Sequence, residues 1–220
     1  MNKLTKRLKL ISELVSKDII ADVGCDHGKL AKELLDTNKI KFAYISDISS
    51  ASLQKAIDLL GGYPTKFQAI CCDGLMGYKG CKIDECIIAG MGGYEIMKII
   101  DNSPIDIDTF ILAPQHDIIE LKKYLNSHNF DIDFDIIILD KGKFYNIIKC
   151  RRVKYQVQID EFNLYFGKDN FVNPLSDIDK YIDKYLAKFR DIKSKQKSSN
   201  EKIDKQISLF EKAKKEIRYE

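Results

Sequence analysis

The chain has 220 residues, 45% of them hydrophobic, and a net charge of +3. This length suits one domain of about 150 residues with an appendage, and the composition excludes wholesale disorder. No apolar run reaches the ~20 residues of a membrane-spanning helix, and Met1–Ser16 is amphipathic, unlike a signal peptide, so we expect a cytoplasmic protein. Six cysteines without a Cys-x-x-Cys pair and three scattered histidines predict free thiols and no metal site.

Short apolar runs recur through the first 150 residues, with helical patterns in most gaps between the first five. We expect strands at Ile19–Val23, Phe42–Ser46, Phe67–Cys71, Cys86–Ala89, Thr109–Ala113, Phe134–Leu139 and Phe144–Cys150, and helices at Leu30–Leu35, Ser52–Leu60, Tyr94–Ile100 and His116–Ser127. Such alternation predicts an α/β fold with a parallel sheet. The segment 140–143 is long enough only for a hairpin turn, so the last two strands are antiparallel. This combination is typical of a Rossmann-like class I methyltransferase sheet.

The pattern changes after Arg152. A short helix is expected at Asp160–Lys168, followed by apolar residues at alternating steps of three and four over 175–192. A similar pattern covers 203–217 after the polar break Ser198–Asn200. Two such stripes predict an antiparallel, coiled-coil-like helical hairpin. We therefore expect a catalytic domain at 1–156 and a helical domain at 157–220.

The most informative segment is Ile20–Gly28, with the sequence IADVGCDHG. It predicts a buried strand, a glycine-bearing loop and the start of a helix, and the next strand ends in Asp47. This arrangement is the nucleoside-binding half of a Rossmann-like unit, in which the carboxylate accepts hydrogen bonds from ribose hydroxyls. The alternative is a tight turn between strand and helix that binds no ligand.

The loop also distinguishes between cofactors. Asp26 stands where a dinucleotide-binding loop would have its second glycine, and a carboxylate there would repel a pyrophosphate. It would instead accept hydrogen bonds from the ammonium group of S-adenosyl-L-methionine, so the loop favours that cofactor over NAD. The residues expected to bind it are Asp22, Gly24, Asp26, His27, Gly28, Asp47, Ile48, Asp73, Gly74, Ala89, Gly90 and Met91.

A glycine-rich segment, Gly90–Gly93, follows the fourth strand at the edge where open α/β sheets bind ligands. The chain lacks the Asn/Asp-Pro-Pro-aromatic motif of amino-directed methyltransferases here, which favours a ring nitrogen as the methyl acceptor. Gly92 and Gly93 are expected to line the pocket of the target base, Tyr94 to stack on it, and Asp26 to lie near the reacting centre. An aromatic residue at a helix start is equally often part of the core.

The charge is unevenly distributed. Residues 1–140 carry a net charge of −5 and residues 141–220 one of +8, which suggests a polyanionic partner. The alternative is an ordinary solvated, lysine-rich surface. The residues expected to contact RNA phosphates are Lys3, Lys6, Arg7, Arg151, Arg152, Lys184, Lys188 and Lys195.

From Leu8 to the C-terminal hairpin, the chain resembles the bacterial tRNA (adenine-22-N1)-methyltransferases, the TrmK family. The motifs that carry the resemblance are ADVGCDH at 21–27, DGL at 73–75, IAGMGG at 88–93 and KGKFYNII at 141–148. The resemblance implies a Rossmann-like catalytic domain with a coiled-coil-like domain, and methyl transfer from S-adenosylmethionine to adenine N1 in the D-arm region of tRNA. The chain has Ala113-Pro114-Gln115 where the family usually has Gln-Pro-Asn, and Gly28 where Ala is common.

Three other functions compete with this interpretation. The protein is alternatively a methyltransferase for another RNA or for a small metabolite, a non-catalytic RNA-binding protein with a relic cofactor fold, or an NAD(P)-dependent reductase. An enzyme that acts on a small metabolite has little use for a basic half. The presence of Asp26, Asp47 and Asp73 argues against a fold that has lost its cofactor, and Asp26 argues against NAD as the cofactor. We expect a monomer or a weak dimer.

Overall fold

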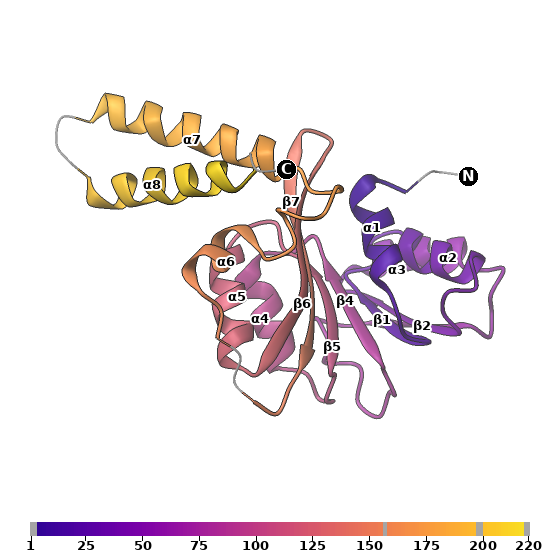
Figure 1. Cartoon of the computed structure of the whole chain (residues 1–220). Coiled ribbons are helices and arrows are strands. Elements are labelled where there is room, and N and C mark those ends of the chain that lie inside the picture. The colour runs from indigo at the N-terminus through magenta and orange to yellow at the C-terminus, as the bar shows by residue number, and fades with distance from the viewer. Residues whose placement is uncertain (1–3, 156–157, 197–199, 218–220) are drawn as a thin grey trace.

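A seven-stranded mixed sheet forms the centre of the computed structural model, which describes residues 4–155, 158–196 and 200–217 (Figure 1). The strand order is β3-β2-β1-β4-β5-β7-β6; the pairings among the first five strands of this order are parallel, and β7 pairs antiparallel with β5 and β6. The strands are β1 (Ile19–Val23), β2 (Phe42–Asp47), β3 (Phe67–Cys71), β4 (Glu85–Ala89), β5 (Thr109–Ala113), β6 (Phe130–Asp140) and β7 (Lys143–Arg152). The expected Rossmann-like class I methyltransferase fold is confirmed.

Helices cover both faces of the sheet and leave the carboxyl ends of the parallel strands open. On one face lie α1 (Lys6–Leu14), α2 (Lys29–Asp36) and α3 (Ser50–Leu59); on the other lie α4 (Gly93–Asp101) and α5 (Ile118–Ser127). Alternate residues of a strand point to opposite faces, so Ile20 joins the first core and Ala21 the second. Burial on both faces explains the nearly continuous apolar runs of the inner strands.

The β6–β7 hairpin is longer than the sequence predicts. β6 begins at Phe130, four residues before the expected start, and its pairing register shifts between Ile132 and Phe134. The acidic residues of this segment obscure its strand pattern. On the other side Leu112 of β5 pairs with Ile148 of β7, so that residues 143–146 extend past Ala113, the end of β5. The hairpin therefore projects beyond the carboxyl edge of the sheet.

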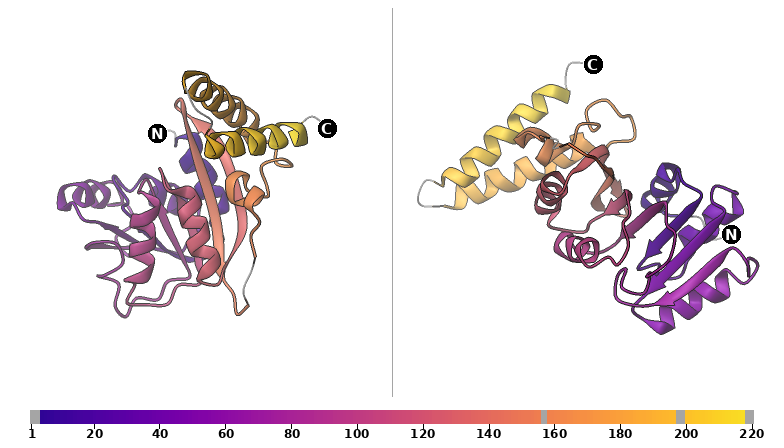
Figure 2. Two further views of the ribbon diagram at one scale, coloured as in Figure 1. Left: turned by 90° about the vertical axis from the view of Figure 1, so that its left-hand side faces the viewer. Right: turned by 90° about the horizontal axis from the view of Figure 1, so that it is seen from below.

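The C-terminal helices are α6 (Glu161–Phe166), α7 (Ile178–Lys195) and α8 (Glu201–Glu216), and α7 and α8 lie side by side as a hairpin (Figures 1 and 2). Their apolar residues, including Ile182 and Phe210, form a third core with Ile137 of β6. The helical hairpin is thus confirmed. Leu175 is not part of it, because this residue is exposed and precedes α7. Ser198 and Ser199 of the expected break lie outside the described part, and the Asn200 side chain caps α8.

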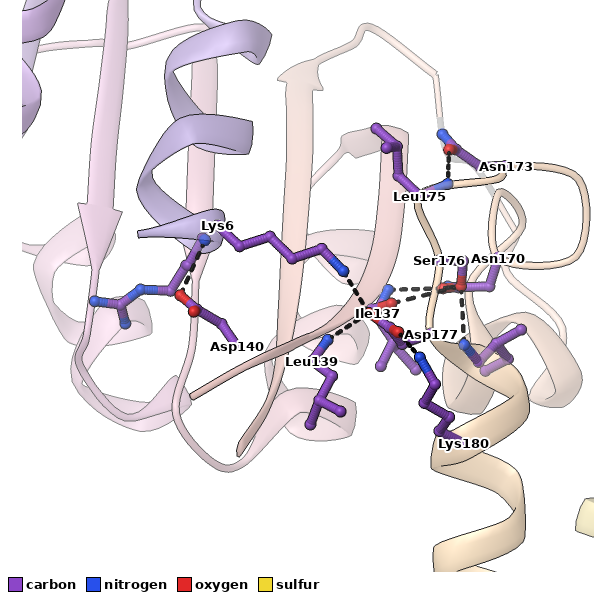
Figure 3. A network of polar contacts seen from close by, with 12 residues as sticks. Lys6, Ile137, Leu139, Asp140, Asn170, Asn173, Leu175, Ser176, Asp177 and Lys180 are labelled. Carbon is purple, nitrogen blue, oxygen red and sulfur yellow. Dashed lines mark hydrogen bonds and ion pairs between the residues drawn. The ribbon is translucent and has the colours of Figure 1, made fainter. Parts of the chain in front are cut away.

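Side chains from the segment between α6 and α7 cover the free edge of β6 (Figure 3). Asp169 Oδ2 accepts a hydrogen bond from Asp135 N at 2.8 Å, and Asn170 Oδ1 one from Ile137 N at 2.6 Å. Asp177 Oδ2 accepts one from Leu139 N at 2.7 Å. These contacts satisfy alternate backbone donors of an edge strand, which would otherwise be open to pairing with another chain.

The expected domain boundary, between residues 156 and 157, lies outside the described residues. In the described ranges, no helix is long and apolar enough to cross a membrane.

Candidate active site

Five loops meet at the carboxyl edge of the parallel strands, and the loop between β1 and α2 turns over the end of β2. The N–H groups of Gly24 and Cys25 both donate to the Ser46 carbonyl at 2.9 Å. Gly24 has φ +70°, in the left-handed region that favours glycine. Gly28 has φ +67° and stands at the N-cap of α2, where a Cβ would lie 2.9 Å from the Cβ of Ala56. The left-handed backbone therefore favours glycine at both positions, and the approach of α3 to the start of α2 adds a second reason at Gly28.

Asp47 holds a fixed carboxylate in the middle of this edge. Its Oδ1 accepts a hydrogen bond from Ser49 N at 2.8 Å, and its Oδ2 accepts one from Asp26 N at 3.3 Å. The next residue, Ile48, is 73% exposed, which is unusual for an isoleucine at a strand end. Two cavities open at this edge, and we name them after the parts of the cofactor that the sequence predicts there. The amino-acid cavity is lined by Asp22, Gly24, Cys25, Asp26, His27, Leu30 and Ala89, together with Arg7, Leu8 and Lys29. The adenine cavity is lined by Ile48, Asp73, Gly74, Leu75, Met76, Glu95, Lys98, Ile99 and Asn102.

Asp22 lies at the bottom of the amino-acid cavity. It is only 5% exposed, and no group in the described ranges donates a hydrogen bond to its carboxylate. Burial, reinforced by the nearby charge of Asp47, raises the pKa of Asp22 to about 7. A buried acid without a donor is costly to ionise unless a cation or a donor arrives. The cavity therefore fits a ligand with an ammonium group.

Asp26 lies at the rim of the same cavity rather than inside it. Its side chain is 73% exposed, and one carboxylate oxygen is 3.0 Å from Nδ1 of His27. The backbone has φ +50°, a left-handed conformation that aspartate tolerates better than most residues. The sequence correctly places Asp26 in the loop, and the structure shows that it faces solvent beside His27.

The loops after β4 and β5 are joined by a ladder of hydrogen bonds. Gly90 N donates to Ala113 O at 3.1 Å, and Gln115 N donates to Met91 O at 2.9 Å. The Gln115 side chain adds a bond from Nε2 to Gly90 O at 2.6 Å. In the Ala113-Pro114-Gln115 segment, the glutamine amide thus holds the Gly90 carbonyl at the edge of the site.

Gly92 and Gly93 lie where two loops of the site approach closely. A Cβ on Gly92 would overlap the ring of His116, and one on Gly93 would overlap the backbone carbonyl of Asp117. These glycines let the β5–α5 loop approach the start of α4, and their place in a pocket for the target base stays a prediction. Tyr94, in the first turn of α4, is exposed as a stacking residue would be.

Arg7 belongs to the amino-acid cavity, although the sequence predicted only a phosphate contact for it. Its guanidinium lies 4.8 Å from the centre of the Tyr145 ring, and its backbone N–H donates to Asp140 at 3.1 Å. These partners come from the projecting β6–β7 hairpin, more than 130 residues away in sequence. No local signal in the sequence could have placed this side chain beside Asp22.

The other expected RNA contacts divide into four groups. Lys3 lies outside the described residues, and Lys6 and Lys195 are paired with Asp177 and Asp191. Arg151 and Arg152 lie at the opposite edge of the sheet from the site, because Arg151 pairs with Thr109 at the start of β5. There, Arg151 is also held by Asp133 and Asp131. The structure therefore does not support RNA contacts near the site for these two arginines. Lys184 and Lys188 are exposed on α7, where Lys184 lies over the ring of Phe144 and Lys188 over that of Tyr185.

Comparisons with known proteins agree with this geometry. A model of the methyltransferase domain family matches residues 4–148. A Mycoplasma pneumoniae protein provisionally assigned as a tRNA methyltransferase is 32% identical over 160 residues, which are 70% of this chain and 75% of the relative. Among solved structures, M. capricolum TrmK in complex with S-adenosyl-homocysteine is 27% identical with a TM-score of 0.86, covering 98% of this chain and 99% of its own. A Streptococcus pneumoniae protein provisionally described as a tRNA (m1A22) methyltransferase is 25% identical with a TM-score of 0.88, covering 96% and 100%.

The strand order and the loops at the carboxyl edge define a Rossmann-like methyltransferase. The chain belongs to the methyltransferase domain family. Over almost its whole length, including the C-terminal helices, it is similar to TrmK.

Proposed function

We propose that this protein transfers a methyl group from S-adenosylmethionine to N1 of adenine 22 in tRNA. The observation that carries the proposal is the combination of a nucleoside-binding edge with a helical hairpin, in a chain that matches TrmK from end to end. The m1A22 assignment of the S. pneumoniae relative supports the choice of the nucleotide.

The residues present fit the cofactor. Asp47 would accept hydrogen bonds from the ribose hydroxyls, and the exposed Ile48 would cover the adenine beside Asp73, whose carboxylate can accept from the exocyclic amine. Asp22 and Asp26 would receive the ammonium group. When bound, S-adenosylmethionine supplies an electrophilic methyl group on a positively charged sulfur.

The chain's own contribution to the reaction is placement. Adenine N1 already carries a lone pair at neutral pH, so no strong general base is required, and most of the rate gain comes from holding N1 in line with the methyl group. A stacked base must first be extruded from the RNA. Tyr94 is placed to stack on the extruded base, and the Gly90 carbonyl, held by Gln115, offers a fixed negative dipole to the ring that becomes cationic.

The tRNA-binding surface proposed here comprises α7 and the tip of the β6–β7 hairpin. Lys184 and Lys188 are exposed on α7, and Lys141 and Lys143 are exposed at the tip, which lies at the same edge as the cofactor loops. Residues 157–220 would thus form the tRNA-binding part, and we expect a monomer or a weak dimer that acts on tRNA in the cytoplasm.

The test is a methylation assay with an unmodified tRNA transcript, followed by mapping of the methylated nucleoside. We expect N1-methyladenosine at position 22, and no product from a transcript with guanine 22. Methylation of both transcripts to the same extent would refute the choice of nucleotide. Binding of tRNA without binding of S-adenosylmethionine, measured by calorimetry, would instead support the alternative of a relic fold.

A further inference from the structure

Asp177 stands at the N-cap position of α7 but does not cap that helix. A capping aspartate would accept hydrogen bonds from the first N–H groups of its own helix. Here the carboxylate points elsewhere (Figure 3): Oδ2 accepts from Leu139 N at 2.7 Å and from Lys6 Nζ at 2.5 Å, and Oδ1 accepts from Lys180 Nζ at 2.6 Å. One side chain therefore connects α7 to both β6 and α1.

The Asp177 carboxylate is almost fully buried, at 9% exposure. Burial alone would raise its pKa, but the hydrogen bond from Leu139 N–H and the ammonium groups of Lys180 and Lys6 lower the pKa to about 2. The group is thus ionised at neutral pH, and its attraction to Lys6 is stronger than that of an exposed ion pair.

The residue after Lys6 is Arg7, which reaches the amino-acid cavity. This first turn of α1 is held at two points, by the Lys6–Asp177 pair and by the bond from Arg7 N to Asp140. Thr5 caps the same turn by accepting a hydrogen bond from Leu8 N at 3.3 Å. The position of the Arg7 guanidinium therefore depends on how this turn is anchored.

The amino-acid cavity pairs cations with anions. Arg7 and Lys29 are its basic residues, and Asp22 and Asp26 are its acids. The amino-acid end of S-adenosylmethionine is itself a zwitterion. If the acids receive its ammonium group, its carboxylate requires a cation, and an arginine presents a planar fork of donors suited to a carboxylate.

We propose that Asp177 is a positioning residue for the cofactor site: through Lys6 it holds the first turn of α1 so that Arg7 can receive the carboxylate of S-adenosylmethionine. The inference rests on the proposed function. Its consequence is energetic coupling between α7, the proposed tRNA-binding helix, and the cofactor cavity. By linkage, tRNA that stabilises the docked position of α7 would tighten cofactor binding, and the cofactor would tighten tRNA binding equally.

The test measures S-adenosylmethionine affinity by calorimetry, without RNA, for the unaltered 220-residue chain, three single variants and the Asp177→Asn/Lys6→Gln double variant. Asp177→Asn removes the negative charge but keeps the shape of the side chain. Lys6→Gln removes the ammonium group that α1 contributes to the ion pair, and because Lys6 is half-exposed, this variant is expected to fold. Lys180→Gln is the matched control, because it removes an ammonium from the same carboxylate on the α7 side only. We expect about fivefold weaker binding for Asp177→Asn and Lys6→Gln, no further loss in the double variant, and a change below about twofold for Lys180→Gln.

Two further readouts separate positioning from general stability. At saturating S-adenosylmethionine, Lys6→Gln should methylate tRNA with a kcat close to that of the parent and a raised KM for the cofactor. If the parent binds the cofactor and Lys6→Gln binds it equally well, the inference is wrong and the proposed function stands. A parent protein that binds no S-adenosylmethionine would overturn both. Equal losses in Lys180→Gln and Lys6→Gln would also overturn the inference, because the effect would then be one of stability.

Discussion

The ionisation of Asp22 links cofactor binding to pH. Its pKa in the folded protein is about 7, against 3.8 for an ordinary aspartate, because burial and the charge of Asp47 disfavour its charged form. A cationic ammonium group requires the charged form, so binding of S-adenosylmethionine should weaken as the pH falls below about 7, by up to about tenfold per pH unit. Calorimetry between pH 5.5 and 7.5 would show this slope. The Asp22→Asn protein should show weak binding without the slope, and a parallel slope in both proteins would assign the titration to another group.

The same residue predicts a compromise between stability and function. Since the pKa of Asp22 is raised on folding, its stabilising contribution is present at low pH and is lost as the pH rises towards and through about 7. Asp22→Asn should therefore raise the melting temperature of the ligand-free protein, and by more at pH 8 than at pH 5. Calorimetric melting at the two pH values would measure this. A lower melting temperature for Asp22→Asn at pH 8 would mean that the carboxylate is stabilised in a way that the geometry does not show.

Asp47 offers a test of the ribose contact. Asp47→Ala should weaken S-adenosylmethionine binding by roughly 1–3 kcal/mol, because a charge-assisted acceptor is lost. The substitution also removes the acceptor for Ser49 N and Asp26 N, so Asp47→Asn, which keeps one side-chain oxygen, serves as the milder companion. Affinity for tRNA alone should hardly change in either variant. Unaltered cofactor affinity in Asp47→Ala would remove this residue from the site.

At the scale of elements, Gly92 and Gly93 differ in what an added Cβ would overlap: a side chain at Gly92 and backbone atoms at Gly93. A Cβ on Gly93 meets the Asp117 backbone, which cannot move away, so Gly93→Ala should cost about 1–3 kcal/mol of unfolding free energy. Gly92→Ala should cost less, because the largely exposed His116 ring can be displaced. Adding His116→Ala should restore the Gly92 variant but not the Gly93 variant. Urea denaturation of these proteins checks the prediction, and equal rescue of both would contradict it.

The docking of α6–α8 on β6 depends on Asn170, which is only 2% exposed. Its side chain accepts from Ile137 N and donates to the carbonyls of Asp135 and Phe166. Asn170→Ala should therefore lower the unfolding free energy by about 1–3 kcal/mol for each buried group left unpaired. Asn173→Ala is the control, since it removes one exposed bond to Leu175 N and should cost less than about 0.5 kcal/mol. Similar denaturation midpoints for the two variants would mean that the edge of β6 does not need these side chains.

At the scale of the whole molecule, the distribution of exposed basic residues that pair with no acid in the described ranges predicts where tRNA binds. Replacing both Lys184 and Lys188 with Gln should weaken tRNA binding and reduce the slope of log affinity against log salt by about 1 per lysine. Replacing Arg151 and Arg152 in the same way should leave the slope unchanged, because they lie at the opposite edge of the sheet and Arg151 is already paired with acids. A salt titration of both double variants measures the difference. Equal reductions of the salt slope in the two double variants would mean that the RNA also contacts the edge that carries Arg151 and Arg152.

Local patterns in the sequence determined the class of fold and located the loops that form the candidate site. Strand and helix periods are properties of neighbouring residues, so the βα units and the terminal hairpin could be predicted from them. The loop that ends in Gly28 and the acid at Asp47 follow two consecutive strands. Two parallel neighbours must end at the same edge of a sheet, so these residues had to meet, as the bond from Asp26 N to Asp47 shows.

Only the tertiary structure decided which charged residues serve the site. The composition shows that the C-terminal part is basic. It does not reveal that Arg151 and Arg152 lie at the edge of the sheet opposite the candidate site, because that follows from the pairing register of β5 and β7. In the same way, Arg7 lines a cavity together with Asp22, and Lys6 pairs with Asp177, through contacts that span 133 and 171 residues. Contacts of this range depend on how the completed sheet positions the β6–β7 hairpin and α7, and no local sequence pattern specifies that position.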